Sequence, residues 1–460
     1  MRNTWMFWLC VGLLAAGCGS DDEEQPKAQP KACSPLEQTG CETGQVCEEV
    51  EGGEPGCYAP VTVVGRVFDT ADDAGIEAAR VVARDANGAA VSSVAVSAAD
   101  GKYALRVPVK RRSDGSAVAT SYTLRADAAG YLAFPKAPRV ALPVDVSRAD
   151  TNGEVANAAT EIGLIALASN TGLGSVSGVV KADNAGGTLV IASAGSGGAA
   201  TGIADADGSY VVFNVPAGSV EVRGFASGLE LTPETASVKA GETTKDVDLE
   251  LAGEATSVVS GSVQIVNGGG ASVTSVILVP ELTFDETALR GEAPRGLRAG
   301  DVSGAWAISG VPNGKYVVLA AFENDGLVRD PDTSIGGTAL VRVEVAGADL
   351  AISAGFKITG ALAVFSPGAD GPEAVTGAPT FKWEDDSSED SYDVTVHDAL
   401  GALVWQTSGV FDPGGSKPAT VQYAGPSLTS GMYYQFRAVS IKDGVPISST
   451  EDLKGVFFAE

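Results

Sequence analysis

The chain has 460 residues, of which 58 are Gly, and its 31 basic and 58 acidic residues give a formal net charge of −27 at pH 7. This charge repels nucleic-acid phosphates and anionic lipid headgroups, so we exclude a nucleic-acid partner. Long runs with helical period are hard to find beyond the N-terminus, which favours a β-rich protein.

The N-terminus has the features of an export signal. Arg2 precedes an apolar run over residues 5–16, which is shorter than the ~20 residues of a membrane-spanning helix. The sequence LLAAGC then ends at Cys18, with Ala15 where Leu is commonest. It resembles the lipobox of bacterial lipoproteins, and the resemblance implies that residues 1–17 are a signal peptide and that Cys18 carries the lipid. The alternative is an ordinary secretory signal cut near Cys18.

Residues 18–32 contain the expected lipidated cysteine, followed by an acidic stretch and a Pro-, Lys- and Gln-rich stretch with nothing to bury. We expect a disordered tether here, and the lipoprotein resemblance implies a lipid bilayer as partner, held through Cys18. Gly19, rather than Asp, follows the cysteine, so the best-known inner-membrane retention signal is absent. We therefore expect a lipid-anchored envelope protein at the outer membrane, on its periplasmic face or at the cell surface.

Residues 33–60 form a small segment with four cysteines, Cys33, Cys41, Cys47 and Cys57. Four cysteines in an exported chain predict two disulfides, and three pairings are open. The segment is too small for a core of its own, so the bridges must supply most of its order. A zinc site is the alternative, disfavoured because there is no C-x2-C pair and no histidine nearby.

From residue 61 onward, three segments repeat one pattern at a period of about 90 residues, which indicates tandem small domains. Each begins with a β-rich stretch interrupted by one Gly and continues to an alternating strand. In the first copy an Asp-Gly turn precedes residues 102–107, where Tyr103, Leu105 and Val107 should share one face. The pattern resembles the carboxypeptidase regulatory-like domain, a transthyretin-like β-sandwich. The resemblance implies sandwiches over residues 61–165, 174–252 and 257–357.

Two stretches depart from this pattern. Residues 280–300 form an insert in the third copy without strand periodicity, and we expect it to project as a loop without chemistry of its own. Residues 109–115 are basic and turn-like. Contact with an anionic glycan is possible there, but a solvated hairpin tip is the preferred interpretation.

Residues 358–460 have different landmarks. Phe381 and Trp383 alternate onto one face, and Tyr434 stands six residues after Leu428. The segment resembles a fibronectin type III domain, with Trp383 matching the core tryptophan. In such sandwiches Tyr434 would bond the backbone near Leu428 and fix a corner.

The sequence argues against catalysis. The zinc carboxypeptidases bind metal through two histidines and a glutamate, whereas this chain has one histidine. His397 follows a strand whose inward residues are Tyr392, Val394 and Val396, so parity points it outward, away from any nucleophile elbow. A carboxylate pair is harder to exclude, but no spacing singles one out.

Other possible sites are weaker still. Asp205 with Asp207, and the acidic residues of 324–332, lack the loop spacing of a calcium site, so we expect turn chemistry. Lys181 lies on a strand suited to an isopeptide bond, but no acceptor can be assigned. The tryptophans of the mature chain are Trp306, Trp383 and Trp405. Parity places all three in the core, which weakens the case for a lectin.

We therefore predict an all-β fold, a tandem array of β-sandwich domains after a short disulfide-rich module, extended as an arm. We expect no catalytic residue, no metal and no cofactor. The predicted function is a non-catalytic, lipid-anchored envelope scaffold that binds envelope protein or glycan. The alternatives are a polysaccharide-binding surface lipoprotein and a hydrolase using carboxylates between domains.

Overall fold

The computed structural model describes residues 33–35, 38–195, 198–266, 274–287, 290–322, 340–353, 356–359, 361–386, 389–411, 417–451 and 453–460. The predicted signal peptide, Cys18 and the 18–32 tether lie outside these ranges. Strands make up nearly all the regular structure, with three single-turn 3-10 helices, so the all-β prediction is confirmed. Within the described ranges, the structure holds no helix with the length and hydrophobicity that a membrane crossing requires.

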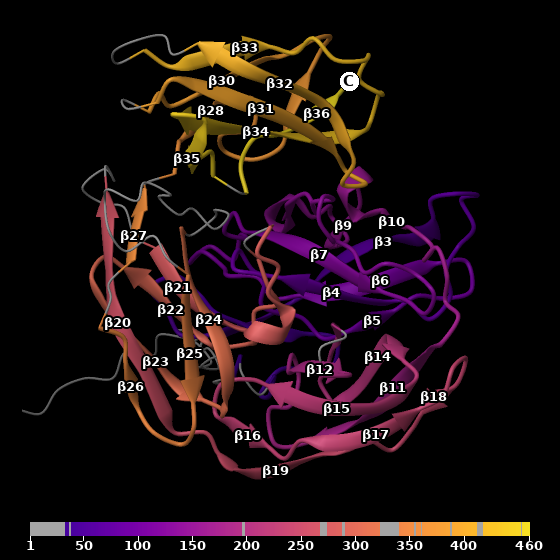
Figure 1. Cartoon of the computed structure of the whole chain (residues 1–460). Coiled ribbons are helices and arrows are strands. Elements are labelled where there is room, and N and C mark those ends of the chain that lie inside the picture. The colour runs from indigo at the N-terminus through magenta and orange to yellow at the C-terminus, as the bar shows by residue number, and fades with distance from the viewer. Residues whose placement is uncertain are drawn as a thin grey trace, which may run out of the picture.

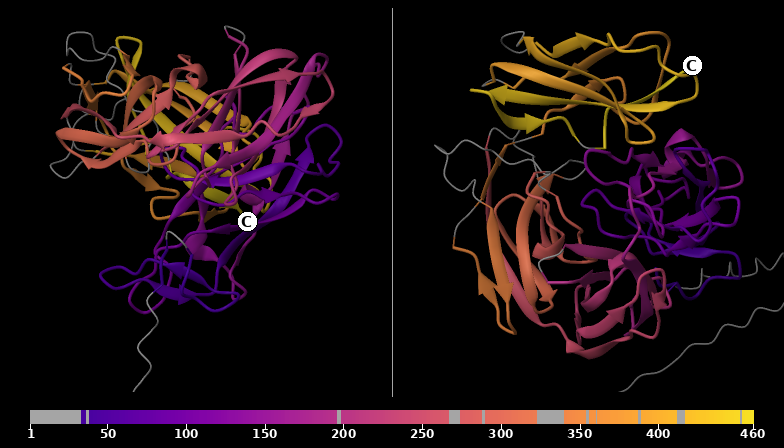
Figure 2. Two further views of the ribbon diagram at one scale, coloured as in Figure 1. Left: turned by 90° about the horizontal axis from the view of Figure 1, so that it is seen from below. Right: turned by 45° about the vertical axis from the view of Figure 1, so that its right-hand side comes forward.

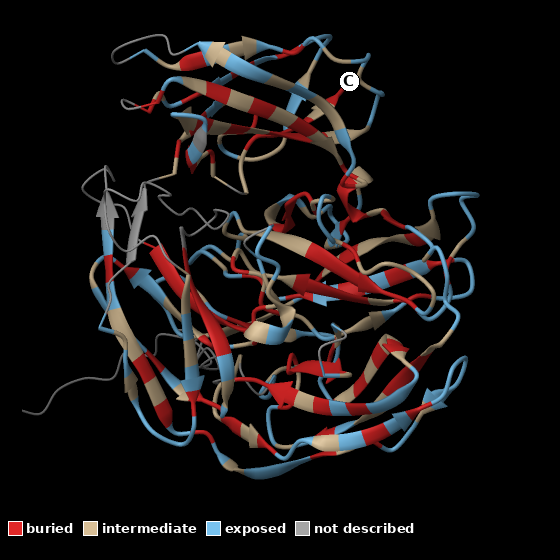
Figure 3. Cartoon of the chain, viewed as in Figure 1, coloured by how far each residue is buried: buried red, intermediate tan, exposed pale blue. Residues whose placement is uncertain are grey.

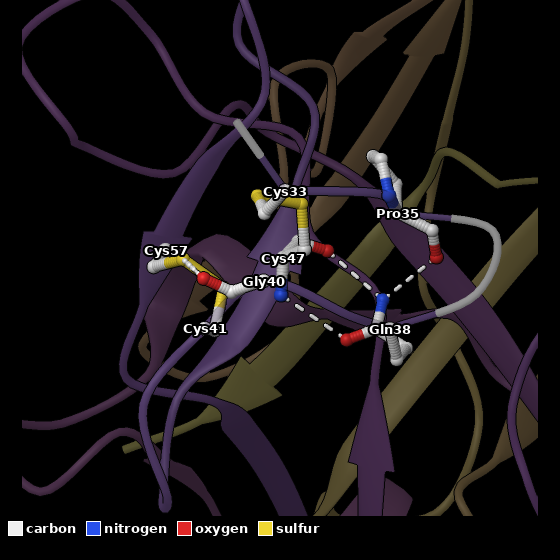
Figure 4. The surroundings of a disulfide bond; sticks show 7 residues. All are labelled: Cys33, Pro35, Gln38, Gly40, Cys41, Cys47 and Cys57. Atoms are coloured by element: carbon white, nitrogen blue, oxygen red, sulfur yellow. Dashed lines mark hydrogen bonds between the residues drawn. A yellow bond between two sulfur atoms is a disulfide. The ribbon is translucent and has the colours of Figure 1, made fainter. Parts of the chain in front are cut away.

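The disulfide module is a two-stranded hairpin of β1 (Val46–Glu48) and β2 (Gly56–Tyr58). Of the three open pairings, the structure has Cys33–Cys47 and Cys41–Cys57, with Cα atoms 5.8 and 5.5 Å apart (Figure 4). The Gln38 amide donates to the Cys47 carbonyl over 2.9 Å and accepts from its N–H over 3.1 Å. Three of these sulfurs lie within 4.8 Å of one another, but all are disulfide-bonded and offer no thiolate to zinc.

The first sandwich follows the module. One sheet has the order β10-β3-β6, with β9 beside β3: β10 (Ile162–Leu164), β3 (Val61–Asp69), β6 (Lys102–Val107) and β9 (Glu154–Val155). The facing sheet has the order β5-β4-β7-β8: β5 (Ala95–Val96), β4 (Arg80–Arg84), β7 (Ser121–Asp127) and β8 (Val144–Asp145). Gly101, at φ 82°, makes the tight turn into β6. Tyr103, Leu105 and Val107 of β6 are buried and their neighbours exposed, as predicted.

The second sandwich repeats this arrangement. Its first sheet is β14-β11-β19-β16 with β18 beside β11: β14 (Ser209–Pro216), β11 (Leu173–Lys181), β19 (Leu249–Glu254), β16 (Leu229–Leu231) and β18 (Thr243–Thr244). Its second sheet is β13-β12-β15-β17: β13 (Ala199–Ile203), β12 (Leu189–Ser193), β15 (Gly218–Phe225) and β17 (Glu234–Val238). All five residues of β12 are buried, because the sheet is covered on both faces.

The third sandwich has the sheets β23-β20-β26, with β27 beside β20, and β22-β21-β24-β25. The first contains β23 (Ala305–Val311), β20 (Ser257–Val266), β26 (Leu350–Ala351) and β27 (Phe356–Thr359). The second contains β22 (Arg298–Val302), β21 (Thr274–Pro280), β24 (Gly314–Phe322) and β25 (Val341–Val345). Like β12, β21 is buried along its whole length.

The fourth sandwich pairs the sheet β28-β30-β33 with β29-β36-β34-β31-β32. The smaller sheet has β28 (Val364–Ser366), β30 (Thr380–Trp383) and β33 (Ala419–Gln422). The larger has β29 (Glu373–Val375), β36 (Val456–Ala459), β34 (Tyr433–Lys442), β31 (Ser391–Asp398), β32 (Leu403–Phe411) and, beside β34, β35 (Val445–Ser449). Phe381 and Trp383 are fully buried. The Tyr434 hydroxyl accepts from the Thr429 N–H over 2.8 Å, which is the predicted corner.

The sandwiches do not form the extended arm that we expected. Figures 1 and 2 show the first three packed around a common centre, with the fourth lying across one side of the group. One buried apolar cluster contains Val82 of the first sandwich, Phe225 of the second and Tyr316 of the third, and Figure 3 shows buried segments, in red, in the strands around the common centre. Strands such as β12 are apolar on both faces, so only packing against a neighbouring sandwich removes that surface from water.

We predict that the double variant Cys41→Ser, Cys57→Ser loosens the module without unfolding the sandwiches. The module has almost no apolar core, so losing a bridge should cost about 2–5 kcal/mol locally. Limited proteolysis should show rapid cleavage within residues 33–60, while the main thermal transition stays in place. Loss of that main transition would contradict an independent module.

Candidate functional site

A recess in the described structure lies where the sandwiches meet. It is a cavity of about 640 Å³, a size typical of small-ligand sites. All four sandwiches contribute to its wall, chiefly through residues 84–88, 131–133, 135–141, 199–201 and 290–292, together with Arg437 and Leu453.

Arg125 on β7 ties three sandwiches together beside this cavity. It is 1% exposed, and its guanidinium donates to Asp127 over 2.8 and 3.1 Å. It also donates to Glu292 of the third sandwich over 2.8 Å, and to the Thr201 hydroxyl of the second over 2.9 Å. Burial favours a neutral guanidinium, but the charges of Asp127 and Glu292 outweigh it, and the pKa of Arg125 is raised. Because Asp127, Thr201 and Glu292 line the cavity, Arg125 supports its wall from behind.

The end of β4 and the turn after it form a second part of the wall. Arg84 lies 3.7 Å from Glu292, and its burial lowers its pKa despite that charge. Asp85 caps the turn by accepting from the N–H of Asn87 over 2.9 Å. Arg298 of the third sandwich donates to Asp85 over 3.1 Å and to the Asn87 side-chain oxygen over 3.0 Å. The turn is therefore fixed from both sides.

Residues 128–141 connect the cavity to the second and fourth sandwiches. The Asn214 amide donates to the Tyr131 carbonyl over 2.8 Å and accepts from the Gly130 N–H over 2.8 Å. Arg139 donates to the Leu400 carbonyl of the fourth sandwich over 3.0 Å and to Gly163 over 2.7 Å. Hydrogen bonds between side chains and backbone groups thus hold this segment on both sides.

The insert at 280–300 does not project, which corrects our expectation. Its Glu292 bonds Arg125, and its Leu297 is 1% exposed in the shared apolar cluster. Arg295 donates to the Asn184 carbonyl of the second sandwich over 2.6 Å. The insert lacks strand periodicity because its side chains complete the junction instead of one sheet face. A cluster of Arg and Glu residues was the only signal, and it does not name their partners.

In the basic stretch 109–115, one residue, Arg111, differs from the solvated hairpin tip that we expected. Arg111 donates to Glu48 of the disulfide module over 2.5 Å, and its guanidinium lies 4.9 Å from the Tyr58 ring centroid. Burial raises the pKa of Glu48 even though Arg111 opposes that shift. Residues 112–114 are exposed, as predicted for a hairpin tip. Arg111 therefore holds the module on the first sandwich.

The possible calcium and isopeptide residues have structural contacts. Asp205 accepts from the Val94 N–H of the first sandwich over 3.0 Å, and Asp207 accepts from the Ser209 N–H over 2.9 Å. Residues 324–332 lie outside the described ranges. Lys181 forms ion pairs with Asp248 and Glu250 at 2.9 and 2.8 Å.

His397 lies on the outer face of β31, as parity predicted, but is half-buried rather than open to solvent. Burial, with a smaller effect from Arg437, lowers its pKa to about 4. Its Nδ1 is buried and bonds no described group, whereas a triad histidine has that nitrogen oriented by a carboxylate. Within the described chain, no carboxylate orients the Nδ1 of His397 in this way.

Two groups of carboxylates in the described structure bear on the hydrolase alternative. At the junction, an arginine pairs with each of three carboxylates: Asp85, Asp127 and Glu292. In the fourth sandwich, the Tyr392 hydroxyl is 2.9 Å from both Asp385 and Glu389. Burial raises the pKa of Glu389 to about 7, aided by its acidic neighbours. That cluster lies within one sandwich, not between domains as the hydrolase alternative requires.

In the described structure, the three tryptophans of the mature chain, Tyr58 and Phe284 do not form an exposed platform on which a sugar could stack. Trp306 and Trp383 are 6% and 0% exposed, and Trp405 is half-buried. Tyr58 and Phe284 are also half-buried. A flat aromatic sugar site at these positions is therefore not formed.

Comparisons with known proteins give only remote likenesses. No family model matches the chain, and no curated protein matches it. The Bacillus anthracis TIE protein is 10% identical, with 92% of this chain and 76% of that chain covered, at a TM-score of 0.16. A DUF3823 family protein from Bacteroides uniformis is 14% identical (43% and 97% covered, TM-score 0.20). A streptococcal ancillary pilin is 10% identical (65% and 99% covered, TM-score 0.16). TM-scores this low carry no argument about this chain.

We predict that Arg125→Ala lowers the free energy of unfolding by about 3–5 kcal/mol, because it leaves the buried Asp127 without its partner and Glu292 with only the longer contact to Arg84. Arg342→Ala is the control, since Arg342 pairs with Glu281 at 3.1 Å in an exposed setting and should cost about 0–1 kcal/mol. Urea unfolding measures both. Equal losses would show that the buried network does not stabilise the junction.

We also predict that Glu389→Gln stabilises the protein at pH 8 and has a smaller effect at pH 5.5. The folded pKa of Glu389 is about 7, above its ordinary 4.5. Its contribution to stability is therefore full below pH 4.5 and lost as pH rises through 7. Glu77→Gln, at an exposed position, should act equally at both pH values. Thermal unfolding compares them, and a pH-independent effect of Glu389→Gln would refute the assignment.

Proposed function

We propose that this protein is a non-catalytic, lipid-anchored scaffold of the bacterial cell envelope that binds an envelope component. The single observation that carries the proposal is the junction, where Arg125 bonds groups from three sandwiches around a cavity of about 640 Å³. A recess walled by several interlocked domains is preorganised for binding.

The charge network favours binding over hydrolysis. Asp127 and Glu292, two of the carboxylates between domains, bond Arg125, and a paired carboxylate is a poor proton acceptor. His397 has its Nδ1 without a partner in the described chain. These contacts support a binding role for the junction.

The anchor is proposed from the N-terminal sequence. The apolar run of residues 5–16 leads to Cys18, and the tether over 18–32 separates it from the disulfide module. A lipid on Cys18 would hold the protein at the outer membrane while the tether lets the sandwiches reach their partner.

We predict that Cys18→Ser moves the protein from the membrane fraction to the soluble envelope fraction of an expressing bacterium. Cys10→Ser is the matched control, because Cys10 lies in the proposed signal peptide and should leave the protein at the membrane. Intact mass of the purified protein should show acyl chains on the parent and on Cys10→Ser only. Membrane retention of Cys18→Ser would overturn the lipid anchor.

Scaffold function itself is tested by sedimenting the purified full chain with isolated cell envelopes. Saturable co-sedimentation that is retained after detergent removal of lipid supports binding to an envelope polymer or protein. Recovery of all the protein in the supernatant would overturn the scaffold proposal.

A further inference from the structure

We propose that the junction cavity binds a short acidic sugar, whose carboxylate is held by the wall formed by Arg84 and Asn87. This inference rests on the proposed function, because it names the ligand class and the site through which the scaffold binds.

Two buried hydrogen-bond donors in the cavity wall have no partner. Asn87 is 9% exposed, and its Nδ2 bonds no described group. Arg84 has 14% of its side chain exposed, and its Nε also bonds no described group. Both residues line the cavity. A buried donor without an acceptor costs free energy, so these donors call for an acceptor supplied by a ligand.

The orientation of the Asn87 amide is fixed by its neighbour. Arg298 donates over 3.0 Å to the Asn87 side-chain oxygen, and arginine has no acceptor, so the amide nitrogen must be the atom turned away from Arg298. The turn is held by Asp85, which accepts from the N–H groups of Asn87 and Ala89 over 2.9 and 3.0 Å. The amide is therefore held in one orientation, and it loses little further side-chain freedom when its nitrogen meets an acceptor.

The local charge differs from that of the whole chain. Against 31 basic and 58 acidic residues overall, the cavity is lined by five cationic residues and four acidic ones. Three of those acids pair with arginines outside the lining: Asp85 with Arg298, and Asp127 and Glu292 with Arg125. The cavity is thus a cationic region in an acidic protein, which attracts an anion. The cationic residues are Arg84, Lys136, Arg139, Arg290 and Arg437.

The same wall favours a sugar over an acidic peptide. Asp285 and Glu292 also line the cavity, and the hydroxyls of a sugar can donate to their oxygens, whereas the extra carboxylates of an acidic peptide cannot. A volume of about 640 Å³ suits a short oligosaccharide rather than a polymer segment. One carboxylate surrounded by hydroxyls matches both the donors and the acceptors.

The test is calorimetric titration of the purified full chain with trigalacturonate, with galactotriose as the neutral sugar and triglutamate as the acidic peptide. We expect saturable binding of trigalacturonate, at least tenfold weaker binding of galactotriose and none of triglutamate. Equal binding of triglutamate would overturn the sugar class. Equal binding of galactotriose would overturn the role of the carboxylate.

Variants locate the site. Asn87→Asp keeps the oxygen that faces Arg298 but replaces the free donor with an acceptor, and should weaken trigalacturonate binding at least tenfold. Gln422→Glu makes the same amide-to-carboxylate change at an exposed position and should bind as the parent does. Lys136→Met, also exposed, tests the cavity without risk to the fold and should weaken binding severalfold. Parent-like binding by Asn87→Asp and Lys136→Met would overturn the site.

The two proposals fail separately. If the chain co-sediments with envelopes but trigalacturonate does not bind, the acidic-sugar inference is wrong and the scaffold function stands. If neither occurs, both are wrong. A rise in the thermal unfolding temperature with trigalacturonate, absent in Asn87→Asp, gives an independent readout of the same site.

Discussion

The arrangement of the sandwiches depends on one buried charge. A guanidinium taken out of water is costly unless it is paired and hydrogen-bonded, and Arg125 meets this need with groups from three sandwiches. Moving the third sandwich away would break the Arg125–Glu292 pair, and moving the second would remove the Thr201 hydroxyl that accepts from Arg125. The apolar cluster shared by the same sandwiches supplies the bulk of the attraction, while the ion pairs fix the geometry in which they meet.

Several arginines of this acidic chain lie at contacts between units. Arg80 and Arg139 donate to carbonyls of the second and fourth sandwiches, Arg298 crosses from the third to the first, and Arg111 holds the disulfide module. These contacts use positive charge that the chain, with 31 basic and 58 acidic residues, has in short supply. The cavity between the sandwiches is likewise lined by more cationic than acidic residues.

Local features were predictable because they depend on nearby residues. The alternation of Tyr103, Leu105 and Val107 gave the inward face of β6, and the spacing of Tyr434 from Leu428 gave the corner in the fourth sandwich. The insert at 280–300 and the arrangement of the domains were not predictable in this way. Their determining contacts join residues such as Arg125 and Glu292, which are far apart in sequence and carry no periodic signal.

The sequence by itself determined the β-sandwich class, the inward faces of the strands and the presence of two disulfides, since strand alternation and cysteine number are local properties of the chain. Only the tertiary structure decided the disulfide pairing, the packing of the sandwiches around a common centre and the cavity with its unpartnered Asn87 and Arg84 donors. The physical reason is that burial and hydrogen-bond satisfaction are set by which distant surfaces come together, and no local pattern specifies that choice.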